Sequence, residues 1–170
     1  FRSDYGSDLN NWSVGVRLTY GDNSFVMCGD AENQAEEDII KNGAVLKADV
    51  LKAGHHGSST STSDAFLKKV SPSWVVIQCG KGNSYGHPHK ETMEKLKKAG
   101  CQVLRTDEEG TITAFSDGKT ITWSTGTAAV PGTSAGSGGN QTAAIPDTDN
   151  GAAAENEAGN PSTRSSYVIN

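Results

Sequence analysis

Residues 48–58 have the sequence ADVLKAGHHGS, in which a short apolar run leads into two histidines flanked by glycines. The run over 48–53 has the length and composition of a buried strand. His55 and His56 follow directly after it. In open α/β sheets, ligands bind at the carboxyl ends of such strands. This stretch therefore predicts an α/β fold with a site at the end of the strand.

Strand and helix patterns alternate on both sides of this stretch. Strands are expected over 12–20, 24–28, 73–79, 102–105, 111–115 and 120–123, and helices over 31–42, 64–70 and 90–99. Alternation of this kind predicts a sheet covered by helices. The first two strands form a hairpin around Gly21, and the last two form another, so the sheet is expected to be mixed rather than purely parallel.

Composition divides the 170-residue chain into unequal parts. Hydrophobic residues make up only 34%, and residues 124–166 contain no Phe, Trp, Tyr, Leu, Met or Cys. A segment of this kind cannot bury enough apolar surface to fold. We therefore expect a domain over 1–123 and a disordered linker over 124–166. Apolar residues return at 167–170, which is either the start of a further module or simply the chain end.

Charge and cysteine content exclude several classes of protein. The chain has 15 Lys and Arg against 20 Asp and Glu, a net charge of −5. Proteins that hold nucleic acid by bulk electrostatics need a basic face, whereas a phosphodiester-cutting enzyme can take its positive charge from a metal. Three widely spaced cysteines do not make a disulfide framework. No apolar run approaches the length of a membrane span, so no membrane contact is expected.

The four histidines fall into two clusters, His55–His56 and His87–His89, and Asp30 follows the end of another strand. These strand ends are expected to converge. Residues two apart on an extended backbone face the same way, so His87 and His89 can share a site, whereas adjacent His55 and His56 should point in opposite directions. Only one of that pair is then expected to bind a metal. A carboxylate with imidazoles suits zinc, manganese or iron.

Four segments taken together resemble a known family. They are NNWS at 10–13, CGD at 28–30, ADVLKAGHHGS at 48–58 and NSYGHPH at 83–89. In this order and spacing they resemble the metallo-β-lactamase-like hydrolase domain of ComEC-type competence proteins and their stand-alone secreted relatives. The resemblance implies the second half of an αβ/βα sandwich. The family's histidine-rich ligand loop belongs to the first half, and no histidine precedes His55.

The resemblance also implies roles for individual residues. Asp30 matches a bridging metal carboxylate, and His56 is the first choice for a metal ligand within the histidine pair. His87 matches the family's late loop histidine, which binds substrate, supplies a proton or binds the metal. We assign His55 and His87 to orienting the phosphate or protonating the leaving oxygen. Asn11 stands where many relatives carry a further metal histidine, and we assign it to substrate binding together with Ser58 and His89. The implied cofactor is a divalent metal, zinc or manganese, as one or two ions.

The function expected from the resemblance is metal-dependent hydrolysis of phosphodiester bonds, with DNA as the leading substrate. One alternative is a phosphoester hydrolase that acts on phosphocholine or cell-wall polymers. The other alternative is a non-catalytic binding module with a degenerate metal site. The Asn at position 11, in place of a metal-binding histidine, is the feature that supports this alternative. The missing N-terminal half of the domain is the expected partner. Without that half, we expect one apolar sheet face to be uncovered. The expected location is extracellular or at a bacterial cell surface.

Overall fold

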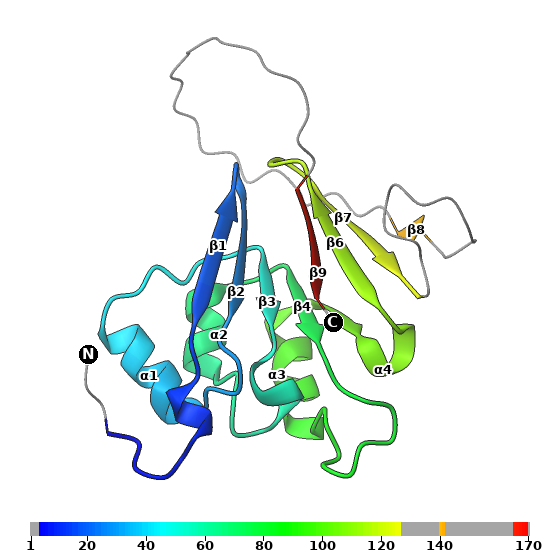
Figure 1. The fold of residues 1–170 in the computed structure, drawn as a ribbon. Coiled ribbons are helices and arrows are strands. Elements are labelled where there is room, and N and C mark those ends of the chain that lie inside the picture. Colours follow the sequence, from blue (N-terminus) through cyan, green and yellow to red (C-terminus); the bar gives the residue numbers. More distant parts are fainter. Residues whose placement is uncertain (1–3, 127–139, 142–164, 170) are drawn as a thin grey trace, which may run out of the picture.

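The computed structural model describes residues 4–126, 140–141 and 165–169, which form two sheets. The larger sheet contains, in spatial order, β1 (Val16–Tyr20), β2 (Asn23–Met27), β3 (Val50–Lys52), β4 (Trp74–Ile77) and β5 (Gln102–Arg105). Strands β2 to β5 are parallel, and β1 pairs with β2 as an antiparallel hairpin. The predicted α/β class with a mixed sheet is therefore confirmed (Figure 1).

Three helices cover one face of this sheet. They are α1 (Asn33–Lys41), α2 (Asp64–Val70) and α3 (Lys90–Ala99). Phe66 and Val70 of α2 and Leu96 of α3 pack with Val26 and Leu51 of the sheet in one buried cluster. Local signals set the helix ends, since the Ser63 hydroxyl caps α2 by accepting from the Phe66 amide, and Gly100 ends α3 in a left-handed conformation.

A second sheet covers the opposite face. Its strands, in spatial order, are β8 (Asn140–Gln141), β7 (Ile121–Thr125), β6 (Ile112–Ser116) and β9 (Ser165–Ile169). Buried residues of β6 and β7 pack on buried residues of the larger sheet, and the rings of Trp123 and Trp74 lie 5.2 Å apart. The expectation that the final hairpin joins the same sheet was therefore wrong, as was the expectation of a wholly uncovered sheet face.

The chain leaves the larger sheet immediately after β5. The short helix α4 (Thr106–Glu109) follows Arg105 without a gap, and Gly110 has a positive φ of 73° that redirects the backbone. The next strand consequently runs over the face of the larger sheet instead of extending its edge. The mixed character of the larger sheet comes from β1 alone, because β2 to β5 are parallel.

The N-terminal segment also differs from expectation, because the strand predicted over 12–20 begins only at Val16. The 3₁₀ helix η1 (Asn10–Trp12) takes the preceding residues. The Asp8 carboxylate accepts hydrogen bonds from the Asn10 amide at 3.1 Å and the Asn11 side chain at 2.6 Å, which favours a turn there.

The predicted linker over 124–166 lies mostly outside the described residues, although β7 extends to Thr125. Strand β9 pairs antiparallel with β6, and a further module beginning at 167 stays a prediction. Within the described part of the chain, no helix has the length and apolar character of a membrane span.

Candidate metal and phosphodiester site

Three loops meet at the carboxyl edge of the larger sheet. Asp30 follows β2, the 3₁₀ segment η2 (Gly54–Gly57) follows β3, and residues 78–89 connect β4 to α3. The His55 amide donates to the Gly29 carbonyl at 3.1 Å, and the His89 amide donates to the Gly57 carbonyl at 3.0 Å. The structure thus brings Asp30 and both histidine clusters together at one edge of the sheet, as the strand ends predicted.

Gly57 permits the close approach of the two histidine loops. Its φ is +86°, and a Cβ atom there would lie 2.7 Å from the Cβ of Pro88. The positive φ and the close contact with Pro88 both disfavour a side chain, which explains why glycine stands at this position. His55 and His56 themselves have φ of 47° and 56°, a left-handed conformation that non-glycine residues rarely adopt. The prediction that His55 and His56 lie on an extended backbone, which would point them in opposite directions, was therefore wrong. Both imidazoles lie at the edge of the sheet that carries the candidate site.

Asp30 and His56 provide the convergent pair of metal-type donors. The Nε2 atom of His56 lies 3.5 Å from an Asp30 carboxylate oxygen. The His56 Nδ1 donates to the Gln78 carbonyl at 2.7 Å, because a carbonyl oxygen can only accept. With the proton on Nδ1, a neutral His56 has its lone pair on Nε2, the atom that lies 3.5 Å from Asp30. A ligating histidine is usually held in just this way by a carbonyl or carboxylate.

His55 is held by a different acceptor, the carboxylate of Glu32. Its Nδ1 lies 3.2 Å from Glu32 Oε1, which also accepts from the Thr60 hydroxyl at 2.9 Å and the Asn10 side chain at 3.3 Å. The carboxylate therefore favours the tautomer with the proton on Nδ1 and a free Nε2. The His55 ring lies 5.5 Å from that of His87, centroid to centroid.

The two histidines of the second cluster have different environments. Among the described residues, no hydrogen bond holds the ring of His87. Burial lowers the pKa of His87, and neighbouring His89, His55 and His56 lower it further. His89, in contrast, accepts from the Ser59 amide at 3.0 Å through Nδ1 and donates to the Tyr85 carbonyl at 3.1 Å through Nε2. Both nitrogens of His89 are thus occupied within the chain.

Asn11 and Ser58, assigned from the sequence to substrate binding, are buried with their polar atoms paired inside the protein. The Asn11 oxygen accepts from the amides of Glu32 and Ala35, at 3.0 and 3.2 Å, and so caps the start of α1. The Ser58 hydroxyl lies 3.0 Å from that of Thr60. These contacts support structural roles, and substrate binding by either residue stays a prediction.

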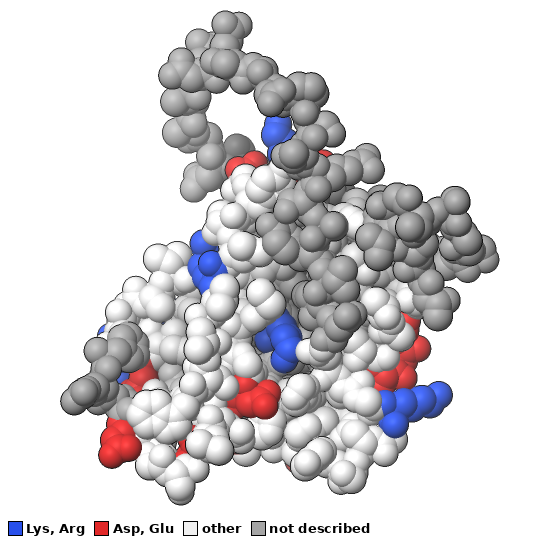
Figure 2. Space-filling view, in the orientation of Figure 1, with Lys and Arg blue, Asp and Glu red and all other residues white. Residues whose placement is uncertain are grey.

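The positive charge at this edge is sparse. Burial lowers the pKa of Lys52, while the nearby Asp30 carboxylate opposes that shift. Figure 2 shows Lys and Arg side chains scattered over the visible face rather than gathered into a continuous patch. The fold therefore provides no broad basic surface on this face for a polyanion, in line with the net charge of −5.

The donor set fits part of a metal site. Asp30 and His56 have suitable chemistry for zinc or manganese, with His56 anchored by Gln78. Within the described residues, no group of three or more His, Cys, Asp or Glu side chains is arranged to hold a metal ion. A catalytic zinc site usually takes three protein ligands. Further ligands are therefore needed in addition to those this part of the chain provides.

Sequence reasoning missed Glu32, which directly precedes α1, and Glu36, which lies in its first turn. Glu36 is buried, and its two carboxylate oxygens accept from the amides of Thr62 and Ser63 at 2.6 and 2.8 Å. The two acids lie four residues apart, hence on one face of a helix end. The four-residue spacing could have pointed to a shared role for the two acids. The same spacing is also typical of solvated charges on an exposed helix, so it does not distinguish the two cases.

The chain matches no family model. It is 40% identical over 103 residues to ComE operon protein 3 of Bacillus subtilis, covering 61% of this chain and 13% of that protein. It is 37% identical over 106 residues to competence protein ComA of Neisseria gonorrhoeae, covering 62% of this chain and 15% of the relative. Over that stretch the chain is homologous to competence proteins.

A further relative is recombination protein 2 of Haemophilus influenzae, 36% identical over 103 residues, which are 61% of this chain and 13% of that protein. The chain thus spans only 13 to 15% of the length of these curated relatives. The competence part of the predicted resemblance is confirmed, and the metallo-β-lactamase sandwich stays a prediction.

Proposed function

We propose that this chain forms part of a metal-dependent hydrolase that cleaves phosphodiester bonds in DNA. The approach of His56 Nε2 to Asp30 at 3.5 Å, with the other nitrogen of His56 fixed on Gln78, is the observation that carries the proposal. Homology to competence proteins supports DNA as the substrate. The resemblance seen in the sequence leads us to propose an extracellular or cell-surface location as well.

Asp30 and His56 would hold the metal, zinc or manganese, which when bound would supply an activated water and a Lewis acid for the phosphate. His55, in its protonated form, donates from Nε2 to a phosphate oxygen, because Glu32 accepts from its Nδ1. His87 stands 5.5 Å from His55, centroid to centroid, with its ring nitrogens available to exchange a proton with the leaving oxygen. The half-buried ammonium of Lys52 offsets negative charge beside Asp30.

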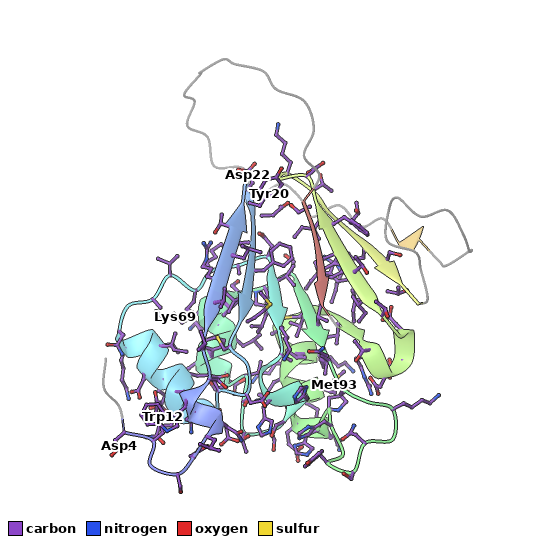
Figure 3. All side chains as sticks on the ribbon, viewed as in Figure 1. Asp4, Trp12, Tyr20, Asp22, Lys69 and Met93 are labelled. Atoms are coloured by element: carbon purple, nitrogen blue, oxygen red, sulfur yellow. The ribbon has the colours of Figure 1, made fainter. Side chains whose placement is uncertain are left out.

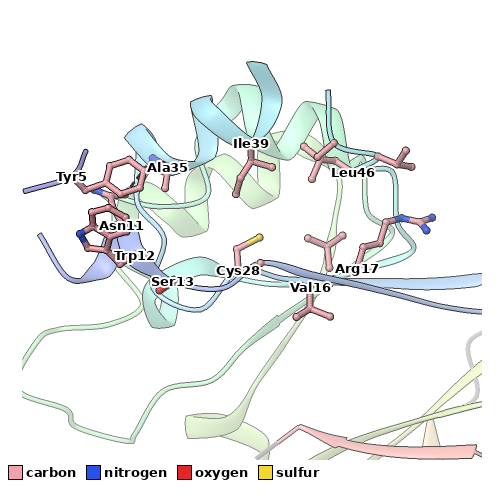
Figure 4. Close-up of a pocket in the computed structure, with 14 residues that line it drawn as sticks. Tyr5, Asn11, Trp12, Ser13, Val16, Arg17, Cys28, Ala35, Ile39 and Leu46 are labelled. Atoms are coloured by element: carbon pink, nitrogen blue, oxygen red, sulfur yellow. Dashed lines mark hydrogen bonds between the residues drawn. The ribbon is translucent and has the colours of Figure 1, made fainter. Parts of the chain in front are cut away.

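The remaining ligands come from an N-terminal half of the same domain, which we propose as the partner. Strand β1 is an edge strand of the larger sheet, and its first residue Val16, together with Trp12 and Val14 just before it, is an exposed large hydrophobic residue. A cavity of about 430 Å³ lies between this edge and α1, lined by Tyr5, Ile39 and other apolar side chains (Figure 4). Exposed apolar surface of this kind marks an interaction site.

Metal content and hydrolysis of the longest natural form of the protein test the proposal. Asp30→Asn should reduce bound zinc or manganese and slow DNA cleavage by about 100-fold or more. Asp22→Asn is the matched control. Asp22 lies in the turn between β1 and β2, at the end of the hairpin opposite to Asp30, and Figure 3 shows it well away from Trp12 and Met93. The chain without an N-terminal half should cleave DNA poorly.

Several outcomes would contradict the proposal. Less than one metal per chain, with cleavage unchanged in Asp30→Asn, would favour a non-catalytic binding module. Metal-dependent cleavage of phosphocholine or wall-polymer esters without cleavage of DNA would favour the other phosphoester hydrolase.

A further inference from the structure

Tyr85 presents an aromatic ring to solvent at the rim of the candidate site. The residue is 77% exposed and lies in the loop between β4 and α3. Its ring is stacked on that of His87, with centroids 5.7 Å apart and planes inclined by 21°. The imidazole contacts one side of the phenol ring, and the high exposure leaves the rest of the ring open.

The loop that carries Tyr85 is tied down by its own hydrogen bonds. The Asn83 side chain donates to the carbonyls of Gly80 and His87, at 2.9 and 2.6 Å, and accepts from the His87 amide at 3.0 Å. The Tyr85 carbonyl accepts from His89 at 3.1 Å. The backbone at Tyr85 is therefore held in place before any ligand arrives, which lowers the ordering that stacking on its ring costs.

We propose that Tyr85 stacks on an unpaired base of a single-stranded nucleic acid whose phosphate lies beside His55 and His87. This inference rests on the proposed function and deepens it by naming the form of the substrate. A base inside a duplex has both faces covered, so only an unpaired or flipped base can stack on a protein ring. Stacking tolerates any base sequence, because every base has a π-face.

A choline group is the other chemistry that recognises an aromatic ring. Proteins bind quaternary ammonium groups in cages of several aromatic rings. Within the described residues, the ring contact of Tyr85 is with His87 and not with a Phe, a Trp or another Tyr. A single open ring next to a phosphate site therefore favours a nucleobase over choline.

Binding of a short oligothymidylate and of the same backbone without bases tests this inference, in the longest natural form of the protein. EDTA is present, so that binding is measured by fluorescence anisotropy without hydrolysis. Tyr85→Ala should weaken oligothymidylate binding by about tenfold, and Tyr85→Phe should retain most of the affinity. The base-free strand should bind about tenfold more weakly than oligothymidylate, and Tyr85→Ala should weaken it no further.

Lys81→Ala is the matched control in the same loop, because loss of an exposed cation should weaken both strands alike. Equal affinity of Tyr85→Ala and wild type for oligothymidylate would overturn the inference, as would equal binding of the two strands to wild type. Displacement of the oligonucleotide by glycerophosphocholine, dependent on Tyr85, would assign the ring to choline instead. A Tyr85-dependent base effect without metal-dependent cleavage would retain this inference and reject the hydrolase.

Discussion

The two histidine loops differ in what holds their imidazoles. In the loop after β3, His55 and His56 each use Nδ1 to bind an acceptor of the chain, and Nε2 of His56 lies 3.5 Å from Asp30. In the loop before α3, His89 is bonded through both nitrogens, whereas no hydrogen bond holds the ring of His87 within the described residues. Four residues of one type thus have at least three chemical environments within one site.

The comparison shows that spacing alone does not assign a role to a histidine. His87 and His89 lie 4.7 Å apart, centroid to centroid, which agrees with the prediction that they share one site. Their hydrogen bonds nevertheless separate them, because an imidazole bonded at both nitrogens has neither a lone pair for a metal nor an N–H for a phosphate oxygen. The partner of each nitrogen decides what the ring can do.

Replacing one histidine from each loop gives the largest expected contrast. His56→Ala should lower metal affinity by about 100-fold or more, since even the loss of an indirect partner of a ligand costs up to about 100-fold. His89→Ala should leave metal affinity nearly unchanged and lower the free energy of unfolding by about 1 kcal/mol, because the Ser59 amide loses its acceptor. Competition titration with a chelator and urea unfolding measure the two effects. Equal losses of metal affinity would remove the distinction between the loops.

Replacing Glu36 tests how the loop that follows β3 is anchored to α1. Glu36→Ala should lower the free energy of unfolding by about 2 kcal/mol, because the buried amides of Thr62 and Ser63 lose their carboxylate acceptor. The matched control is Glu37→Ala, whose exposed pair with Lys41 should contribute less than about 0.5 kcal/mol. Urea unfolding measures both losses, provided that the free energy of unfolding depends equally steeply on urea concentration in the two variants and the wild type. A loss in Glu36→Ala no larger than in the control would show that the loop is held by other contacts.

Strand patterns predicted most of the larger sheet because buried parallel strands have long apolar runs, such as residues 73–79. The position of β6 and β7 was not predictable in this way. An alternating hairpin fits the edge of one sheet or the face of another equally well, and tertiary packing, such as that of Trp123 on Trp74, decides between them.

The candidate site was predictable to the extent that strand ends converge, which brought Asp30 near His56. The hydrogen-bond partners were not predictable, because they depend on the left-handed backbone at His55 and His56 and on the approach of α1. Asn11 shows the same limit, since its contacts with the start of α1 span more than twenty residues of sequence.

Glu32 tests whether the orientation of His55 matters. Glu32→Gln keeps the shape of the side chain but removes the charge that favours a proton on Nδ1. Wild-type neutral His55 should show the Nδ1-protonated tautomer in long-range ¹⁵N NMR, whereas the variant should show a mixture and cleave DNA about tenfold more slowly. Glu37→Gln on the same helix should change neither. An unchanged tautomer in Glu32→Gln would assign the orientation of His55 to the backbone alone.

The smallest expected effect concerns the dependence of stability on pH. The pKa of His87 lies below its ordinary value of 6.5, because burial and the neighbouring His89, His55 and His56 disfavour its charged form more than Asp30 favours it. The unfolded chain therefore binds this proton at a higher pH than the folded chain does. Above pH 6.5 both states are neutral at this residue, so its contribution to stability is complete there and is lost as the pH falls from 6.5 through the folded pKa.

Unfolding free energies of the metal-free protein, measured between about pH 8 and about pH 5, follow this effect. His87→Asn should show a shallower decline below pH 6.5 than the wild type, because it lacks the group whose protonation favours the unfolded state. A decline as steep as in the wild type would mean that the His87 ring is as well solvated in the folded chain as in the unfolded one. Its contrast with His89 would then rest on hydrogen bonding alone.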